Sequence, residues 1–239
     1  MPVHAFSQPK GRLEFFQTDA HALLDNLLGD PTARTVGVYV PQACREGERY
    51  PLLIDLAGFT GSGLSHLAWK GFGETVPQRI DRLMMQGHLA PAVYVFPDCF
   101  TSLGGNQYVD SIAMGHWARW LHEVLVPGVE ARYPVITEPG GRGLFGKSSG
   151  GYGALHQALH HGEHWGAVVC HSGDMDFELC YGREFPEVLL ALTQSGLSVP
   201  GYIERLHRRR RIGGGEMHVL MMFAMAASYD PDPDAPFGV

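Results

Sequence analysis

The chain has 239 residues, of which 45% are hydrophobic and 18% are charged, and its net charge is −7. This length can bury a large core, and we expect residues 1–239 to form one α/β domain. The negative charge argues against a nucleic-acid partner, because the basic run Arg208 to Arg211 is short and typical of a solvated helix end. No apolar stretch approaches the length of a membrane span, so we expect no membrane partner.

Strands and helices alternate along the chain. The expected strands are Arg12 to Thr18, Thr35 to Val40, Pro51 to Ala57, Ala92 to Phe96, Gly143 to Phe145 and Gly166 to Cys170. The expected helices are Thr75 to Gln86, Ser111 to Val126, Gly151 to His160, Glu184 to Thr193, Ile203 to Arg208 and Glu216 to Ser228. The first two strands alternate apolar and polar residues and are typical of half-exposed antiparallel strands near an edge, whereas the later runs are apolar throughout. This order predicts a three-layer α/β fold with a mostly parallel sheet.

Four cysteines (Cys44, Cys99, Cys170 and Cys180) are widely spaced, and no C-x-x-C pair occurs. The segment Met1 to Gln17 has no apolar core of the kind that a secretory leader contains. Reduced thiols are the simplest interpretation, which predicts a cytoplasmic location. We expect Cys99 and Cys170 to behave as buried, small hydrophobic residues.

The most specific motif is Gly146-Lys147-Ser148-Ser149-Gly150, which stands between an expected strand and an expected helix. A serine at such a sharp turn is exposed above the sheet, and the glycines let two backbones approach closely. This context predicts that Ser148 is a nucleophile and that the amide of Ser149 faces the same space. The loop after the strand that ends at Ala57 would supply a second oxyanion donor, and we expect it to be the amide of Phe59.

Several further stretches together resemble the esterase branch of the α/β-hydrolases, which holds S-formylglutathione hydrolase (esterase D), enterochelin and feruloyl esterases, and the antigen-85 mycolyltransferases. The stretches that carry the resemblance are Tyr50 to Gly61, Val95 to Cys99, Gly104 to Tyr108, Glu130 to Pro134 and Gly146 to Leu155. The resemblance implies the α/β-hydrolase sandwich, Ser148 as nucleophile, an oxyanion hole of the Phe59 and Ser149 amides, and a small-molecule ester as substrate. We expect no cofactor. One departure is Ala57-Gly58, where the family usually has His-Gly.

A larger departure concerns the acid and the base of the catalytic triad. In this family both lie far downstream of the serine, after the last strands, whereas the residues from Gly173 onward here read mainly as helices. The resemblance therefore implies a chain that is shortened at its C-terminus and lacks the final strands. The strand Gly166 to Cys170 would then have a free edge, which predicts pairing with a second copy in a homodimer.

Residues within the chain could still complete a triad. The candidate acids are Asp174 and Asp176, together with Asp230 and Asp232 if Val219 to Ala227 is a strand. The candidate bases are His171, His207 and His218, and a pair of Ser148 with Lys147 stays open. No sequence context selects among them.

A metal site is not expected. His160, His161 and His164 lie close in sequence, but Gly162 interrupts them and no ligand spacing is completed, so we interpret them as a solvated helix end. The aromatic residues expected near the active edge are Phe59, Phe100, Tyr108, Trp117 and Tyr152, with core packing favoured for Tyr108 and Trp117.

Three functions remain open from the sequence. The first is a serine carboxylic-ester hydrolase, in which a histidine and a carboxylate move the proton of Ser148. The second is an esterase-like scaffold that lacks a base and has little or no turnover. The third is an acyltransferase of the same fold, which passes the acyl group to an acceptor other than water.

Overall fold

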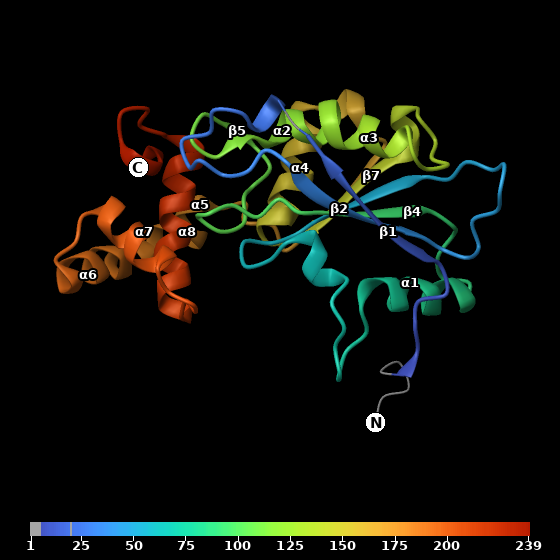
Figure 1. Cartoon of the computed structure of the whole chain (residues 1–239), viewed down its shortest axis with the longest axis horizontal. Helices are drawn as coiled ribbons and strands as arrows, with labels where there is room; N and C mark the ends of the chain where they lie inside the picture. Colours follow the sequence, from blue (N-terminus) through green and yellow to red (C-terminus); the bar gives the residue numbers. More distant parts are fainter. Residues whose placement is uncertain (1–5, 20) are drawn as a thin grey trace.

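A six-stranded sheet organises the computed structural model, which describes residues 6–19 and 21–239 (Figure 1). Its strand order is β1-β2-β4-β3-β7-β8. The strands are β1 (Arg12–Thr18), β2 (Arg34–Val40), β3 (Leu52–Leu56), β4 (Val93–Pro97), β7 (Arg142–Lys147) and β8 (Ala167–His171). β2 is antiparallel to both of its neighbours, β1 and β4. The strands β4, β3, β7 and β8 are parallel to one another. Each expected strand is present, and β1 is partly exposed as predicted. The half-exposure predicted for the second strand is wrong, because every residue of β2 except Thr35 is buried. Residues 1–5 of the segment searched for a leader lie outside the described residues.

Helices cover both faces of this sheet (Figure 1). On one face lies α1 (Val76–Met85), and on the other lie α2 (Trp117–Arg119), α3 (Val126–Glu130) and α4 (Ser149–His160). Short helical turns are η2 (His21–Leu23), η3 (Gly63–His66), η5 (Pro139–Gly141), η6 (Gly162–His164), η7 (Gly182–Glu184) and η8 (Pro236–Gly238). α1 starts with a capping box, in which the Thr75 hydroxyl accepts from the Gln78 amide and the Gln78 side chain accepts from the Thr75 amide.

The predicted helix Ser111 to Val126 is wrong at its start. Residues 110–116 form a small hairpin of β5 (Asp110–Ser111) and β6 (Gly115–His116), and helix begins only at Trp117. The Ser111 hydroxyl accepts from the amides of Ala113 and Met114, which offers the backbone a local alternative to helix.

The helical segment that begins at Trp117 continues past Pro127. Residues Trp120–Leu125 form a π-helix (η4), and α3 follows directly with Pro127 in its first turn. The Val126 amide donates to the Leu121 carbonyl, five residues back, so a π-turn lies directly before Pro127, whose missing N–H interrupts the regular α-helical hydrogen bonds.

The C-terminal part of the chain forms helices beyond the end of the sheet (Figure 1). These are α5 (Phe177–Cys180), α6 (Phe185–Ser195), α7 (Val199–His207) and α8 (Gly214–Tyr229). The expected helices over this region are confirmed, and the alternative strand at 219–227 is wrong because these residues lie within α8. In the described part of the chain, no helix has both the length and the apolar character needed to cross a membrane.

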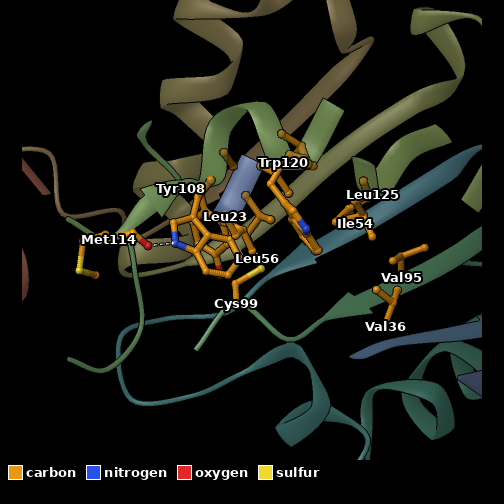
Figure 2. Packing of buried hydrophobic residues seen from close by; sticks show 14 of the residues in the cluster. Leu23, Val36, Ile54, Leu56, Val95, Cys99, Tyr108, Met114, Trp120 and Leu125 are labelled. Atoms are coloured by element: carbon orange, nitrogen blue, oxygen red, sulfur yellow. Dashed lines mark hydrogen bonds between the residues drawn. The ribbon is translucent and has the colours of Figure 1, made fainter. Parts of the chain in front are cut away.

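The main core lies between the sheet and the helices on the α4 side. Figure 2 shows Ile54 and Leu56 of β3 in the same cluster as Trp120 and Tyr108, all of them buried. The Trp117 indole donates to the carbonyl of Met114 at 2.8 Å. Parallel register places Leu56 of β3 opposite Gly146 of β7, so the carboxyl ends of the central strands meet at one edge. This packing fixes the position of the turn that follows β7.

Replacing Leu52 by alanine should destabilise the fold by about 2–5 kcal/mol, because its side chain is fully buried in the central strand and the sheet cannot collapse around the cavity. The matched control is Leu189→Ala in α6, where the leucine is 63% exposed. Denaturant unfolding of both variants measures the difference. Equal stabilities for the two variants would contradict this account of the core.

Candidate active site

Ser148 connects β7 to α4 in a conformation that is uncommon for any residue except glycine. Its φ is 57° and its ψ is −125°, so it lies in the positive-φ half of the backbone map. The Ser148 amide donates to the carbonyl of His171 at 3.1 Å, and the Ser148 carbonyl accepts from the Tyr152 amide at 2.9 Å. The turn is therefore held from β8 on one side and from the first turn of α4 on the other. The side chain is half-buried and remains accessible.

Two glycines make this turn possible, as the sequence predicts. A Cβ on Gly150 would lie 1.8 Å from the carbonyl oxygen of Leu56, and one on Gly146 would lie 2.3 Å from the carbonyl oxygen of Gly150. No side chain fits at either distance. The start of α4 is consequently pressed against the end of β3.

The loop after β3 runs beside Ser148. A Cβ on Gly58 would lie 3.4 Å from the Cβ of Ser148. The Phe59 carbonyl accepts from the Gly105 amide at 2.7 Å, and the Ala57 carbonyl accepts from the Tyr108 hydroxyl at 2.8 Å. Residues 104–108 thus anchor this loop through hydrogen bonds. Tyr108 is buried, which confirms the core packing predicted for it.

The amides of Phe59 and Ser149 are the expected oxyanion donors. Ser149 is the first residue of α4, where amides have no intrahelical acceptor. Within residues 6–19 and 21–239, neither amide has a hydrogen-bond partner.

Ser148 lines a cleft of about 910 Å³. One wall is the loop after β3 together with η3, and the opposite wall includes Met217, His218 and Met221 of α8. His171, at the end of β8, also lines it. Of the expected aromatic residues, Phe59 lies at this cleft, whereas Trp117 is buried in the core.

Asp174 is the candidate acid that the structure brings to the serine. Its carboxylate accepts from the Ser148 hydroxyl at 3.2 Å, from the Ser149 hydroxyl at 3.0 Å and from the Tyr181 hydroxyl at 2.9 Å. Burial is the main cause of a raised pKa at Tyr181, and the charge of Asp174 raises it further, so this hydroxyl stays protonated and donates. Sequence reasoning missed Tyr181, because nothing in its local sequence distinguishes it.

The other candidate acids lie elsewhere. Asp176 caps α5 by accepting from the Leu179 amide at 3.0 Å. Asp230 caps the end of α8, and Asp232 accepts from the Asp234 amide at 2.9 Å in the C-terminal turn. Each of these has a local structural role.

Among the candidate bases, His171 and His218 line the cleft and His207 does not. The Nδ1 atom of His218 lies 3.1 Å from a Glu184 carboxylate oxygen. His207 instead has its Nε2 atom 2.9 Å from the Ser102 carbonyl. A third imidazole of the cleft, His66, was missed from the sequence, and its Nδ1 contacts the buried carboxylate of Asp55.

The histidines at the end of α4 form part of a larger cluster than the sequence indicated. His122 of η4 stacks on His164 with ring centroids 4.3 Å apart and lies 5.0 Å from His161, and His156 lies 4.4 Å from His160. His160 is exposed, but His161 and His164 are half-buried against η4. The described residues contain no group of three ligand side chains that could hold a metal ion.

Of the two predictions made for cysteines, one is confirmed and the other is wrong. Cys99 is buried, and this burial raises the pKa of its thiol well above the usual value. The prediction for Cys170 is wrong, because β8 is the last strand of the sheet and its thiol is exposed. All four cysteines are free, and the cytoplasmic location inferred from them stays a prediction.

The sheet, its helices on both faces and the turn at Ser148 define an α/β-hydrolase. The family model described as "Putative esterase" matches residues 31–181, and the chain belongs to this family. No curated protein matches the chain in sequence.

Solved structures of esterases share the fold at low sequence identity. A ferulic acid esterase is 21% identical, with a TM-score of 0.55, over 70% of this chain and 60% of its own length. A feruloyl esterase module from Clostridium thermocellum, solved with sinapinate, is 15% identical over 84% of this chain and 68% of its own, with a TM-score of 0.53. The fluorophosphonate-binding serine hydrolase F of Staphylococcus aureus is 15% identical over 90% of this chain and 74% of its own, with a TM-score of 0.54. The chain thus spans 60% of the length of that ferulic acid esterase.

Stability should fall as the pH drops from about 6.5 toward 4. Burial, followed by the charges of His160 and His161, lowers the pKa of His156 from 6.5 to about 4. In this window the unfolded chain binds a proton at His156 that the folded chain does not, so protonation favours unfolding. His156→Phe, which keeps a ring and removes the titration, should flatten the dependence of Tm on pH, with the exposed His88→Phe as control. An identical loss of Tm in wild type and H156F would contradict this assignment.

Proposed function

We propose that the protein is a serine carboxylic-ester hydrolase that works through an acyl-enzyme on Ser148. The observation that carries this proposal is the left-handed turn at Ser148, which presents an accessible hydroxyl in the cleft at the end of β7. Membership of an esterase family supports carboxylic-ester hydrolysis as the chemistry. The proposed substrate is a small-molecule ester, and no cofactor takes part in the proposed steps.

In this proposal Ser148 attacks the ester carbonyl, and the amides of Phe59 and Ser149 bind the oxyanion that forms. The support is that both N–H groups are free within the described residues and that the loop carrying Phe59 is anchored by Gly105 and Tyr108. Donors held in place before the reaction stabilise developing charge without reorganising.

Ser148→Ala should lower kcat for p-nitrophenyl acetate by at least about 1000-fold, since the nucleophile is lost. It should also abolish labelling by a fluorophosphonate. The control is Ser195→Ala, because the Ser195 hydroxyl donates to the Leu192 carbonyl and accepts from the Leu197 amide at the end of α6, and it does not line the cleft. If S148A keeps the turnover of wild type, the proposal is refuted. If wild-type protein is folded but shows neither turnover nor labelling, the impaired scaffold is favoured instead.

We also propose that the free edge of β8 pairs with β8 of a second copy. β8 is the last strand of the sheet, Val169 on it is 61% exposed, and Leu159 on the adjacent α4 is 72% exposed. An unpaired edge flanked by apolar side chains favours strand addition.

Light scattering coupled to size exclusion should therefore give a dimer mass. Val169→Lys should shift the protein to monomer, because two-fold pairing at this point would place the lysines close together. Phe72→Lys, at a 91% exposed site in the segment between η3 and α1, is the matched control. A monomer mass for wild type at all concentrations would contradict the pairing.

A further inference from the structure

The floor of the cleft beside Ser148 is one face of the sheet. Phe145 of β7 is opposite Val169 of β8, and Lys147 is opposite His171 two residues further along. Side chains at these alternate positions point to the same face of the sheet. It is the face that α1 covers, because Phe145 packs against the core cluster on the α1 side. All four residues line the cleft, so the end of β7 places Lys147 on its floor.

Three side chains that are positively charged at neutral pH line this cleft, namely Lys70, Arg79 and Lys147. Lys147 is the last residue of β7, Lys70 lies in the segment between η3 and α1, and Arg79 lies in α1. All three are exposed, so a ligand in the cleft can reach them. Three separate segments thus bring positive charge to the cavity that Ser148 lines.

The two carboxylates that line the cleft are already compensated. Glu74 accepts two hydrogen bonds from the Arg82 guanidinium, both at 2.8 Å, whereas Nε of Arg79 lies 3.9 Å from the same carboxylate. Asp55 is buried at the end of β3, and its carboxylate contacts Nδ1 of His66. The cleft therefore presents an excess of positive charge to a ligand, although the whole chain has a net charge of −7.

We propose that the cleft selects esters that carry a carboxylate remote from the reacting carbonyl, and that Lys70, Arg79 and Lys147 determine this specificity. The inference rests on the proposed esterase function and names a substrate class for it. Opposite charges that share one cavity attract a ligand and orient it, and they act more on specificity than on affinity.

The charges around the serine decide where the substrate carboxylate lies. Asp174 accepts from the Ser148 and Ser149 hydroxyls, at 3.2 and 3.0 Å, so it repels a second anion close to the nucleophile. Lys70 and Arg79 belong to segments on the α1 side, apart from the turn that carries the serine. The carboxylate of the substrate is therefore expected at these two cations.

Apolar side chains line other parts of the same cleft. Phe145 and Val169 lie on its floor, and Met217 and Met221 of α8 lie on one wall. A hydrocarbon chain between the ester and the carboxylate would bury apolar area against them. Ion pairs with exposed side chains are individually weak, so a measurable preference needs several cations together.

Two pairs of esters test the preference. p-Nitrophenyl hydrogen adipate and p-nitrophenyl hexanoate have acyl chains of equal length and differ in the terminal carboxylate. 4-Acetoxybenzoate and its methyl ester place the charge on the alcohol part instead. For each pair we define the selectivity ratio as kcat/KM of the anionic ester divided by kcat/KM of the neutral ester, after subtraction of the uncatalysed rate. The pair whose ratio responds to the variants shows which part of the ester carries the charge.

Lys147→Met and Arg79→Met should each lower the selectivity ratio by about threefold, and the triple variant K70M/R79M/K147M should lower it by about tenfold or more. The control Arg210→Met removes an equal charge from the exposed segment between α7 and α8, and it should leave the ratio within about 1.5-fold of wild type. The ratio of wild type should also fall at high ionic strength, because salt screens exposed charges. A triple variant that is folded by circular dichroism and keeps the wild-type ratio in both pairs would overturn the proposal.

Binding without turnover gives a second readout. The amide analogues of the two anionic esters, N-(4-nitrophenyl)adipamic acid and 4-acetamidobenzoate, can be titrated calorimetrically into Ser148→Ala protein. At least one analogue should bind about tenfold more weakly once the three methionine substitutions are added. Equal affinities of both analogues for the two proteins would contradict the proposed role of the cations.

The two proposals fail in different ways. If Ser148 turns over the esters and neither the selectivity ratio nor the binding of the analogues responds to the three substitutions, only the charge preference fails. If no ester is turned over through Ser148 while binding of an anionic analogue still depends on the three cations, the esterase function fails and the charge preference of the cleft stands.

Discussion

The site depends on a contact between two backbones that leaves no room for a side chain. The start of α4 lies so close to the end of β3 that a Cβ on Gly150 would lie 1.8 Å from the Leu56 carbonyl oxygen. Parallel pairing of β3 with β7 fixes both partners at this level, so the turn cannot move away without breaking the sheet. The left-handed conformation of Ser148 is imposed by this packing, and the folded core stabilises the strain.

The same contact couples the serine to the oxyanion loop. Tyr108 donates to the carbonyl of Ala57, and its ring packs so closely on α4 that a Cβ on Gly153 would lie 2.4 Å from it. Tyr108 itself has a φ of 60° and is fully enclosed. One buried side chain therefore sets the spacing between the loop that carries Phe59 and the helix that carries Ser149.

Elements whose signals are local could be predicted from the sequence. Alternation of apolar and polar residues predicted the first two strands, and continuous apolar runs predicted the others. The glycines around Ser148 predicted the turn, because close approach needs glycine at fixed positions. The error at Ser111 arose because the helical pattern of Trp117 to Leu125 was extended into a hairpin that side-chain hydrogen bonds form. The error at Cys170 is different, since exposure of β8 depends on the absence of a neighbouring strand in the described sheet. A strand's own residues do not reveal its neighbours.

The residues that complete the candidate site show the same limit. Ser148, Phe59 and Ser149 were predicted from motifs, whereas Asp174 was one of several candidate acids and Tyr181 and His66 were not considered. Asp174 reaches the serine because the chain after β8 turns back over α4, where a Cβ on Gly173 would lie 2.8 Å from the Tyr152 amide nitrogen. Tyr181 lies at the end of α5, so its contact with Asp174 depends on the position of that helix. Such convergence is a property of tertiary packing and has no counterpart in local sequence.

The position of α4 also limits what its dipole contributes to catalysis. The positive N-terminal end of this helix lies at Ser149, beside both the Asp174 carboxylate and the expected oxyanion. This end of the helix favours negative charge at either place, so it stabilises the Asp174 carboxylate as well as an anion bound at the Ser149 amide. Only an interaction that is stronger in the transition state than before it lowers a barrier. In the proposed reaction, the hydrogen bonds from the Phe59 and Ser149 amides to the oxyanion would be interactions of this kind.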